Sequence, residues 1–501
     1  MRRLAQLALL AFVVAGLAGT ESARPEQAAP SRPLLTGVAD PSAIEADAAL
    51  AMNRIRAAGA TVVRIVLPWE GVAPVSPGPA FRASDPDDPA YAWGRFDDQV
   101  RAADANGLSV LAVVVGAPPW AQDRPARAPA QDASWRVRPP ALAAFATAAA
   151  RRYSGGTAPR VRFWQVWNEP NYSGFLNPQL ASQLDRPPSL PLDADDVVSP
   201  DQYRELVNAF GDAVRAVDSS NLVVAGGLLP FSGAGPSIGV SVGPLLFMRK
   251  LLCMSGGATP RPTCGHEIRF DVWSTHPYTV GGPRVHATLP DDVSIGDLPE
   301  MNRLLRAAVA AGRVRSSRPV EFWVTEFGWD TKPPDSHGVP LGLHARWVAE
   351  ALYRMWSAGV TLVAWFGLRD DETRGRPEGN VIQSGLYFRG DAPVGDRPKP
   401  TLAAFRFPFV AFHEGRRIRV WGRLPPQRSG AVVVEQSSSR GWRRLATLRP
   451  DANGIFGGLL GLRGSKPLIR ARLAAGGLTS VPFSLRKPPD LVVNPFGGPV
   501  G

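Results

Sequence analysis

Short apolar runs alternate with longer helical stretches between Pro33 and about Glu414, and this alternation limits the folds open to the chain. Eight runs rich in β-branched and apolar residues are candidate strands: residues 34–38, 61–67, 108–115, 161–167, 222–225, 269–275, 320–325 and 361–366. Eight parallel strands that alternate with helices close into a barrel. We therefore expect residues 33–414 to form a (β/α)8 barrel with long loops.

Helical patterns fill the segments between these strands, at residues 43–58, 140–153, 201–217, 299–311, 341–358 and 401–413. The alternative α/β architecture is a doubly wound open sheet. No glycine-rich dinucleotide or phosphate loop follows the first strand, which favours the barrel. A length of 501 residues excludes one small binding module, and 45% hydrophobic with 20% charged residues excludes a wholly disordered chain.

The pattern changes after Glu414 to short strands at residues 417–422, 431–436, 468–473 and 478–485, separated by Gly-, Pro- and Asn-containing turns. Such a stretch without helix patterns predicts a small β-sandwich over residues 415–487. The Pro/Gly-rich residues 488–501 are expected to form a flexible tail.

The positive charge of the chain is concentrated in residues 415–487. This segment holds thirteen arginines, Lys466 and Lys487 against two acidic residues, Glu435 and Asp451, whereas the whole chain carries +12. A solvated arginine-rich surface accounts for this charge. The alternative is a weak contact with an anionic polymer such as cell-wall polysaccharide. We expect no nucleic-acid partner.

The N-terminus has the features of a secretory signal. Arg2 and Arg3 precede an apolar run over residues 4–18, and small residues suitable for cleavage follow at Ala18 and Ala23. The run is shorter than the ~18 apolar residues of a spanning helix. We therefore expect a signal peptide over residues 1–23, a loose leader over residues 24–32, and a secreted, extracellular chain with no transmembrane segment.

The two cysteines, Cys253 and Cys264, are the only ones in the chain and lie 11 positions apart. In an oxidising compartment we expect them to form a structural disulfide. Two cysteines without histidine-rich spacing make a poor metal site.

Two glutamates follow directly on two of the candidate strands. Glu169 lies in the segment WQVWNEPN, residues 164–171, and Glu326 in VTEFGW, residues 324–329. A carboxylate at the exit of an apolar strand is costly unless it faces a polar pocket, and in a barrel both would point into one mouth. Paired carboxylates about 5–5.5 Å apart are the arrangement that double-displacement glycoside hydrolysis requires.

Both segments resemble known motifs. Residues 164–171 resemble the acid/base motif at the fourth strand of clan A glycoside hydrolases, which include the cellulase-like family 5 and the β-xylosidase-like family 39. Residues 324–329 resemble the nucleophile motif at the seventh strand of that clan. The resemblance covers residues 33–414 and implies that Glu169 is the acid/base and Glu326 the nucleophile of a retaining enzyme.

Other positions match the clan pattern one at a time. Arg64, on the second strand, resembles the arginine that supports the nucleophile, and His276 with Tyr278, at the end of the sixth strand, resemble a pair that contacts sugar and nucleophile. Asn168 is expected to donate to the sugar 2-hydroxyl. Trp167, Trp323 and Trp329 offer flat apolar faces on which sugar rings could stack. By the resemblance, Trp120 is a pocket-wall residue, Trp365 is the aromatic floor of the subsite where cleavage occurs, and Trp69 also contacts the substrate. The alternative for Trp69, Trp120, Trp329 and Trp365 is a place in the core.

The chemistry follows from the expected environments. Arg64 and the Tyr278 hydroxyl would hold Glu326 anionic, because opposite charge and donated hydrogen bonds favour a carboxylate. Glu169, with less positive charge nearby, would keep a raised pKa and act first as acid and then as base. No metal or organic cofactor is expected.

The sequence leaves the substrate open among β-glucan, xylan, mannan and cell-wall glycans, because the loops over residues 172–200 and 231–246 would set specificity. Exo and endo cleavage are equally open. The alternative function is that of a binding protein: an inactive carbohydrate-binding or cell-wall-binding protein on a barrel scaffold. We expect a monomer with an oligo- or polysaccharide substrate.

Overall fold

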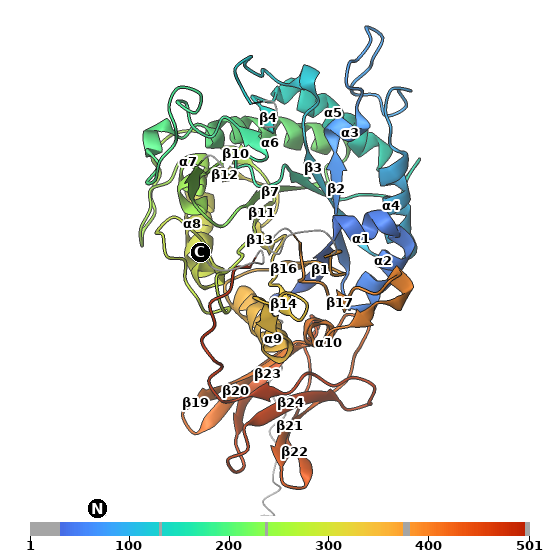
Figure 1. Cartoon of the computed structure of the whole chain (residues 1–501), viewed down its shortest axis with the longest axis vertical. Helices are drawn as coiled ribbons and strands as arrows, with labels where there is room; N and C mark the ends of the chain where they lie inside the picture. The colour runs from blue at the N-terminus through green and yellow to red at the C-terminus, as the bar shows by residue number, and fades with distance from the viewer. Residues whose placement is uncertain (1–30, 130–132, 236–238, 374–380, 496–501) are drawn as a thin grey trace, which may run out of the picture.

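Eight parallel strands close into a barrel in the computed structural model, which describes residues 31–129, 133–235, 239–373 and 381–495 (Figure 1). Neighbouring strands follow the order β1-β16-β13-β11-β7-β5-β3-β2, and β2 pairs with β1 to complete the ring. The strands are β1 (Leu35–Ala39), β2 (Val62–Pro68), β3 (Ser109–Val115), β5 (Phe163–Val166), β7 (Leu222–Leu228), β11 (Val272–Thr275), β13 (Glu321–Val324) and β16 (Leu362–Phe366). The predicted (β/α)8 barrel and its eight strands are confirmed. The predicted signal peptide, residues 1–23, lies outside the described residues.

Helices surround this barrel. They are α1 (Pro41–Ala46), α2 (Ala48–Ala57), α3 (Trp69–Val72), α4 (Gly94–Ala105), α5 (Pro139–Arg152), α6 (Ser199–Val217), α7 (Pro244–Leu251), α8 (Leu298–Ala310), α9 (Leu341–Ser357) and α10 (Pro400–Arg406). In α6, Tyr203, Leu206, Phe210 and Val214 recur at helical spacing and are buried, so one stripe faces the barrel. The single helix predicted over residues 43–58 is two helices, because the Asp47 side chain caps the start of α2 at the Leu50 amide.

An apolar plug fills the barrel interior. Val62, Leu111, Val224, Val272, Trp323, Leu362 and Ala364 form a separate buried cluster. Most of these residues lie at or near the first positions of their strands, so the plug sits toward the N-terminal end of the barrel. The C-terminal strand ends are therefore left for polar groups.

Short two-stranded sheets and 3-10 turns lie in the loops between the barrel elements. The strands are β4 (Ser134–Trp135), β6 (Leu176–Asn177), β8 (Gly233–Gly235), β9 (Gly239–Ser241), β10 (Ile268–Arg269), β12 (Val314–Arg315), β14 (Thr331–Lys332), β15 (Val339–Pro340), β17 (Tyr387–Phe388) and β18 (Arg397–Pro398). The turns are η1 (Pro119–Ala121), η2 (Ala194–Asp196), η3 (Ile295–Asp297) and η4 (Pro393–Gly395).

Two antiparallel sheets form the C-terminal part and pack face to face. One has the order β19-β20-β23 and the other β22-β21-β24-β25. Phe412 of the first sheet contacts Phe483 of the second, with ring centroids 5.4 Å apart. The strands are β19 (Phe409–Glu414), β20 (Arg417–Arg423), β21 (Val432–Ser438), β22 (Gly441–Leu448), β23 (Ile455–Gly461), β24 (Leu468–Leu473) and β25 (Phe483–Ser484).

The helix predicted over residues 401–413 is wrong in its second half. Helix α10 ends at Arg406, and residues 409–414 form β19, which pairs with β20 along its whole length. Pro408 lies between the two elements and cannot continue the helical hydrogen bonds. The C-terminal sheets thus begin at Phe409, six residues before the expected start at 415.

The C-terminal sheets pack on α9 of the barrel, and α10 lies beside α9 (Figure 1). Trp421 of β20 lies 5.5 Å, centroid to centroid, from both Tyr353 and Trp356 of α9. The described part of the expected flexible tail also has a buried residue, Val493, at 3% exposure. At the other terminus, Ser31 donates to the carboxylate of Asp451.

The expected disulfide between Cys253 and Cys264 is present. Within the described ranges, none of the helices combines the length and apolar character that a membrane crossing needs.

Candidate active site

A strained turn presents Glu169 at the end of β5. Trp167 and Glu169 both have left-handed backbone angles, φ 68° and φ 42°, which cost non-glycine residues energy and are tolerated where surrounding contacts enforce them. The Trp167 amide donates to the Val114 carbonyl (2.8 Å) and the Glu169 amide to the Gly227 carbonyl (3.0 Å). Neighbouring barrel strands thus hold the turn from both sides.

Asn171 locks the same turn from within the motif. Its side-chain amide donates to the Leu229 and Val242 carbonyls at 2.9 and 2.8 Å, and its oxygen accepts from the Leu229 amide at 2.9 Å. The amide is fully buried. These contacts therefore fix the backbone turn from which the Glu169 side chain starts.

Glu169 is buried, and in the described part of the chain no arginine or lysine pairs with its carboxyl. Its Oε1 lies 2.9 Å from Nδ1 of His276, whose other nitrogen lies 3.2 Å from the Thr325 hydroxyl. Burial raises the pKa of Glu169 to about 8, against a smaller lowering by Arg64. Burial also lowers the pKa of His276 to about 3, so the imidazole is neutral near pH 7.

Glu326 has the opposite surroundings. Arg64 Nη1 donates to its Oε2 at 3.1 Å, and the Tyr278 hydroxyl donates to its Oε1 at 2.7 Å. Arg64 also donates to Asn168 Oδ1 at 2.5 Å, which ties the two glutamate-bearing strand ends to one guanidinium. The partners expected from the sequence, Arg64 and Tyr278, are thus those found at Glu326. Burial and the Glu326 charge raise the pKa of Tyr278, so its hydroxyl keeps its proton as a donor.

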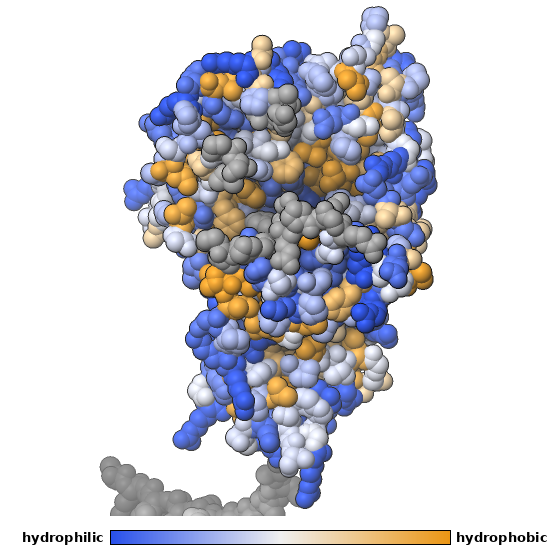
Figure 2. Space-filling view, viewed as in Figure 1, coloured by the Kyte–Doolittle hydropathy of each residue, from blue (hydrophilic) through white to orange (hydrophobic). Residues whose placement is uncertain are grey.

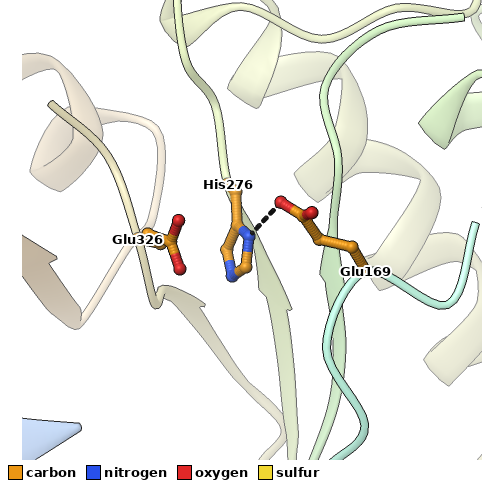
Figure 3. A group of neighbouring side chains, drawn as sticks. All are labelled: Glu169, His276 and Glu326. Carbon is orange, nitrogen blue, oxygen red and sulfur yellow. Dashed lines mark hydrogen bonds and ion pairs between the residues drawn. The ribbon is translucent and has the colours of Figure 1, made fainter. Parts of the chain in front are cut away.

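The two glutamates face each other across His276 (Figure 3). One carboxylate oxygen of each and one nitrogen of His276 all lie within 4.8 Å of one another. This spacing also suits a metal ion, but Arg64 and Tyr278 already occupy both oxygens of Glu326, and the guanidinium would repel a cation. The site lies on a barrel whose face is hollowed at its centre, with hydrophilic atoms in the hollow (Figure 2).

The tryptophans expected to form sugar platforms are mostly buried in the core. Trp69 and Trp365 are 0% exposed and Trp329 is 1% exposed. Trp69 stacks on Phe145. The other indole nitrogens donate inward: Trp167 to Phe175, Trp323 to Glu321, Trp329 to Thr279 and Trp365 to Ser384. These rings contact protein on all sides, so a sugar could reach none of them without rearrangement.

Trp120 is the exception among these rings, because it is partly exposed. It lines a hollow of about 830 Å³ together with Arg136, Gln202 and Glu205, beside the N-terminal ends of α5 and α6. Neither glutamate of the pair lines this hollow. Trp120 therefore borders a separate depression rather than the gap between Glu169 and Glu326.

Sequence reasoning missed Thr325, Asn171 and Gly227. Thr325 and Asn171 stand inside the two motifs and make the contacts described above. At Gly227 a side chain would approach the Gln165 amide to 2.6 Å, so only glycine fits beside the turn that carries Glu169. For Gly227, the signal available in the sequence was a glycine at the end of an apolar run.

Comparison with known proteins gives one family match. Residues 35–233 match the model of the cellulases, glycosyl hydrolase family 5, which confirms the resemblance to clan A carried by the motif at Glu169. No curated protein sequence matches the chain.

Solved structures with a similar fold include three glycoside hydrolases. A family 39 enzyme from Bacteroides cellulosilyticus WH2 has a TM-score of 0.48 and 17% identity, covering 86% of this chain and 81% of that one. A GH30 endoxylanase from Clostridium papyrosolvens C71 has a TM-score of 0.44 and 13% identity, covering 86% and 94%. GH5_18 from Streptomyces cattleya, solved with GlcNAc, has a TM-score of 0.45 and 17% identity, covering 75% and 79%.

Proposed function

With a family 5 glycosyl hydrolase match over residues 35–233 as the premise, we propose that the chain is a secreted retaining β-glycosidase. It hydrolyses O-glycosidic bonds of a β-linked oligo- or polysaccharide by double displacement. Glu326 is the nucleophile and Glu169 the acid/base.

The close but unequal carboxylate pair carries this proposal. One carboxylate oxygen of Glu169 lies within 4.8 Å of one of Glu326. This suits the short separation of retaining enzymes, about 5–5.5 Å between carboxyl groups, rather than the longer inverting distance. The surroundings divide the roles. Glu326 receives a guanidinium and a hydroxyl donor, whereas burial raises the pKa of Glu169 to about 8 and keeps it protonated at pH 7.

In the first step a carboxylate oxygen of Glu326 attacks the anomeric carbon and forms a glycosyl ester. The bond from that carbon to the leaving oxygen breaks, and Glu169 transfers its proton to this oxygen. Glu169 is left as a carboxylate beside His276. Neutral His276 with its proton on Nδ1 then donates to the new carboxylate without taking its charge.

In the second step water enters on the side that the leaving group vacated. Glu169 removes one proton from the water, the oxygen attacks the anomeric carbon, and Glu326 leaves as a carboxylate. Two inversions give overall retention. Asn168 Oδ1 accepts from Arg64, so its NH2 group is the end that remains to donate to the sugar 2-hydroxyl.

Substitution of each glutamate tests the assignment. On a phenyl β-glycoside, whose leaving group needs protonation, Glu169→Gln and Glu326→Gln should each abolish most turnover while sugar binding remains. The control Glu205→Gln removes an exposed carboxyl on α6 and should keep full activity. NMR of the first-formed product should show the β-anomer. A wild-type chain that binds sugar with no turnover across a panel of aryl glycosides and polysaccharides would instead support a binding protein, and an α-product would contradict double displacement.

Secretion is tested separately. Expression of the full gene in its native host should place the chain in the culture medium, with its N-terminus at residue 19 or 24 if cleavage follows Ala18 or Ala23. An intact Met1 in the cell fraction would contradict this part of the proposal and leave the chemistry untouched.

A further inference from the structure

A second hollow lies where the C-terminal sheets meet the start of the barrel. Its volume is about 730 Å³, and it is lined by residues 33–35, 423–426, 428–431 and 449–454. Hollows of about 300–1,000 Å³ are the size of small-molecule sites. The described chain therefore leaves room here for a group as large as a monosaccharide.

Arg423 lines this hollow and is buried, and among the described residues no carboxylate pairs with its guanidinium. It stands at the end of β20 with 2% exposure. Among the described residues its Nη1 has no hydrogen-bond partner, and burial lowers the pKa of the guanidinium to about 10. The other buried arginines within the described ranges each pair with a carboxylate: Arg64 with Glu326 and Arg204 with Asp201. A buried charge left unpaired is unfavourable by several kcal/mol, so an anion that pairs with it gains more than it would at a surface.

Two further arginines stand at the rim of the hollow. Arg428 and Arg449 both line it and are exposed. The one acidic residue of the lining, Asp451, has both oxygens occupied. Its Oδ2 accepts from the Ser31 amide at 2.8 Å, and its Oδ1 from the amides of Asn453 and Ile455 at 2.9 and 3.0 Å. The lining therefore carries a net positive charge that its own carboxylate does not pair.

The hollow is at the opposite end of the barrel from the glutamate pair. Residues 33–35 precede or begin β1, so they mark the N-terminal end of the strands, whereas Glu169 and Glu326 follow the C-terminal ends of β5 and β13. A group bound here cannot be part of the sugar at the reacting bond. It would be a separate ligand or a distant part of a polymer.

We propose that this hollow is a binding site for one anionic group, a phosphate or a carboxylate, held by Arg423 at its base and by Arg428 and Arg449 at its rim. A planar guanidinium donates two parallel hydrogen bonds to either kind of oxyanion. The proposal does not depend on the glycosidase function, because its readout is binding and not turnover.

Calorimetric titration of the full chain with inorganic phosphate and, separately, with glucuronate tests the site. One or both should bind at one site per chain, with affinity that falls as sodium chloride is added, while uncharged glucose should give no signal at the same concentration. Binding of phosphate alone would identify a phosphate site, and binding of glucuronate alone a carboxylate site. No binding of either anion would overturn the proposal.

Matched variants locate the binding. Arg423→Met should weaken it by about tenfold or more, since hydrogen bonds to charged groups contribute about 1.5–3 kcal/mol. Arg419→Met removes an exposed arginine from the same strand, one that pairs with Glu414, and should change nothing. If Arg423→Met does not fold, the exposed pair Arg428→Ser/Arg449→Ser should lower the affinity instead. Unchanged affinity in Arg423→Met, or in the rim pair should that be the variant measured, would overturn the assignment.

Discussion

His276 Nδ1 lies 2.9 Å from Oε1 of Glu169 in a pocket that excludes water from the imidazole. Burial lowers the pKa of this histidine to about 3 and raises that of the glutamate to about 8. Near neutral pH the pair therefore holds a neutral imidazole and a protonated carboxyl, joined by a hydrogen bond and not by an ion pair. The difference in charge between the two glutamates, protonated Glu169 and anionic Glu326, depends on this contact being neutral.

The pH dependence of kcat/KM should have an alkaline limb set by Glu169. The proposed acid must be protonated in the free enzyme, so the rate should fall as pH rises through about 8. His276 should add no limb between about pH 5 and 9, because it is neutral throughout that range. Initial rates at low concentration of an aryl β-glycoside would measure this. A limb that persists unchanged in Glu169→Gln would assign it to another group.

Leaving-group dependence should separate the acid from the nucleophile. Good leaving groups need little protonation, so Glu169→Gln should lose about 10²–10⁴ in kcat/KM on a phenyl glycoside but far less on a 2,4-dinitrophenyl glycoside. Glu326→Gln should be inactive on both. Equal losses of Glu169→Gln on the two substrates would contradict its role as the acid.

Glu169 should also lower stability at alkaline pH. Its pKa is raised from 4.5 in the unfolded chain to about 8 in the folded one, so between these values the folded chain holds more protons. The free energy of unfolding then falls as pH rises through this window, with a slope of up to about 1.4 kcal/mol per pH unit from this group. Glu169→Gln should remove that slope and be more stable than wild type at pH 9, but not at pH 4. Urea unfolding at several pH values would show this, with exposed Glu205→Gln as the control.

Removal of one donor from Glu326 should lower activity without unfolding the barrel. Tyr278→Phe deletes the hydroxyl that lies 2.7 Å from Oε1, and a hydrogen bond to a charged group contributes about 1.5–3 kcal/mol. The expected loss is about ten- to a hundredfold in kcat/KM, with an unchanged circular dichroism spectrum. The control is Tyr353→Phe on α9, whose ring packs on Trp421 far from the site. A loss of the same size in the control would point to a general effect on folding.

The sequence predicts the strands and the glutamate pair for the same physical reason. Buried barrel strands are runs of apolar residues, so a carboxylate at the end of such a run stands out, as Glu169 and Glu326 do. Contacts between strands are not readable in this way, and the hydroxyl of Thr325 beside His276 was missed. The tryptophans show a second limit. A sequence gives the residue type at a strand end but not the side to which its ring turns, and Trp365 turns inward to the Ser384 carbonyl.

The disulfide should stabilise the fold without affecting catalysis. It joins Cys253 and Cys264 across a separation of 11 residues, and neither cysteine lies among the contacts of Glu169 or Glu326. Closing so short a loop in the unfolded chain contributes about 3 kcal/mol. The double variant Cys253→Ala/Cys264→Ala should therefore unfold at lower denaturant concentration yet keep the wild-type kcat at 25 °C. A large loss of kcat in the folded variant would mean that the loop supports the site.

The packing of Trp421 on α9 should make the barrel and the C-terminal sheets unfold together. The indole is 4% exposed and contacts Tyr353 and Trp356, so it is buried by both parts of the chain. Trp421→Ala should cost about 3–5 kcal/mol and split a single calorimetric transition into two, because the parts lose their shared aromatic contact. The matched control is Trp442→Ala on β22, where Arg470 covers a half-buried ring. That variant should keep one transition, and two transitions already in the wild type would mean that the interface does not couple the two parts.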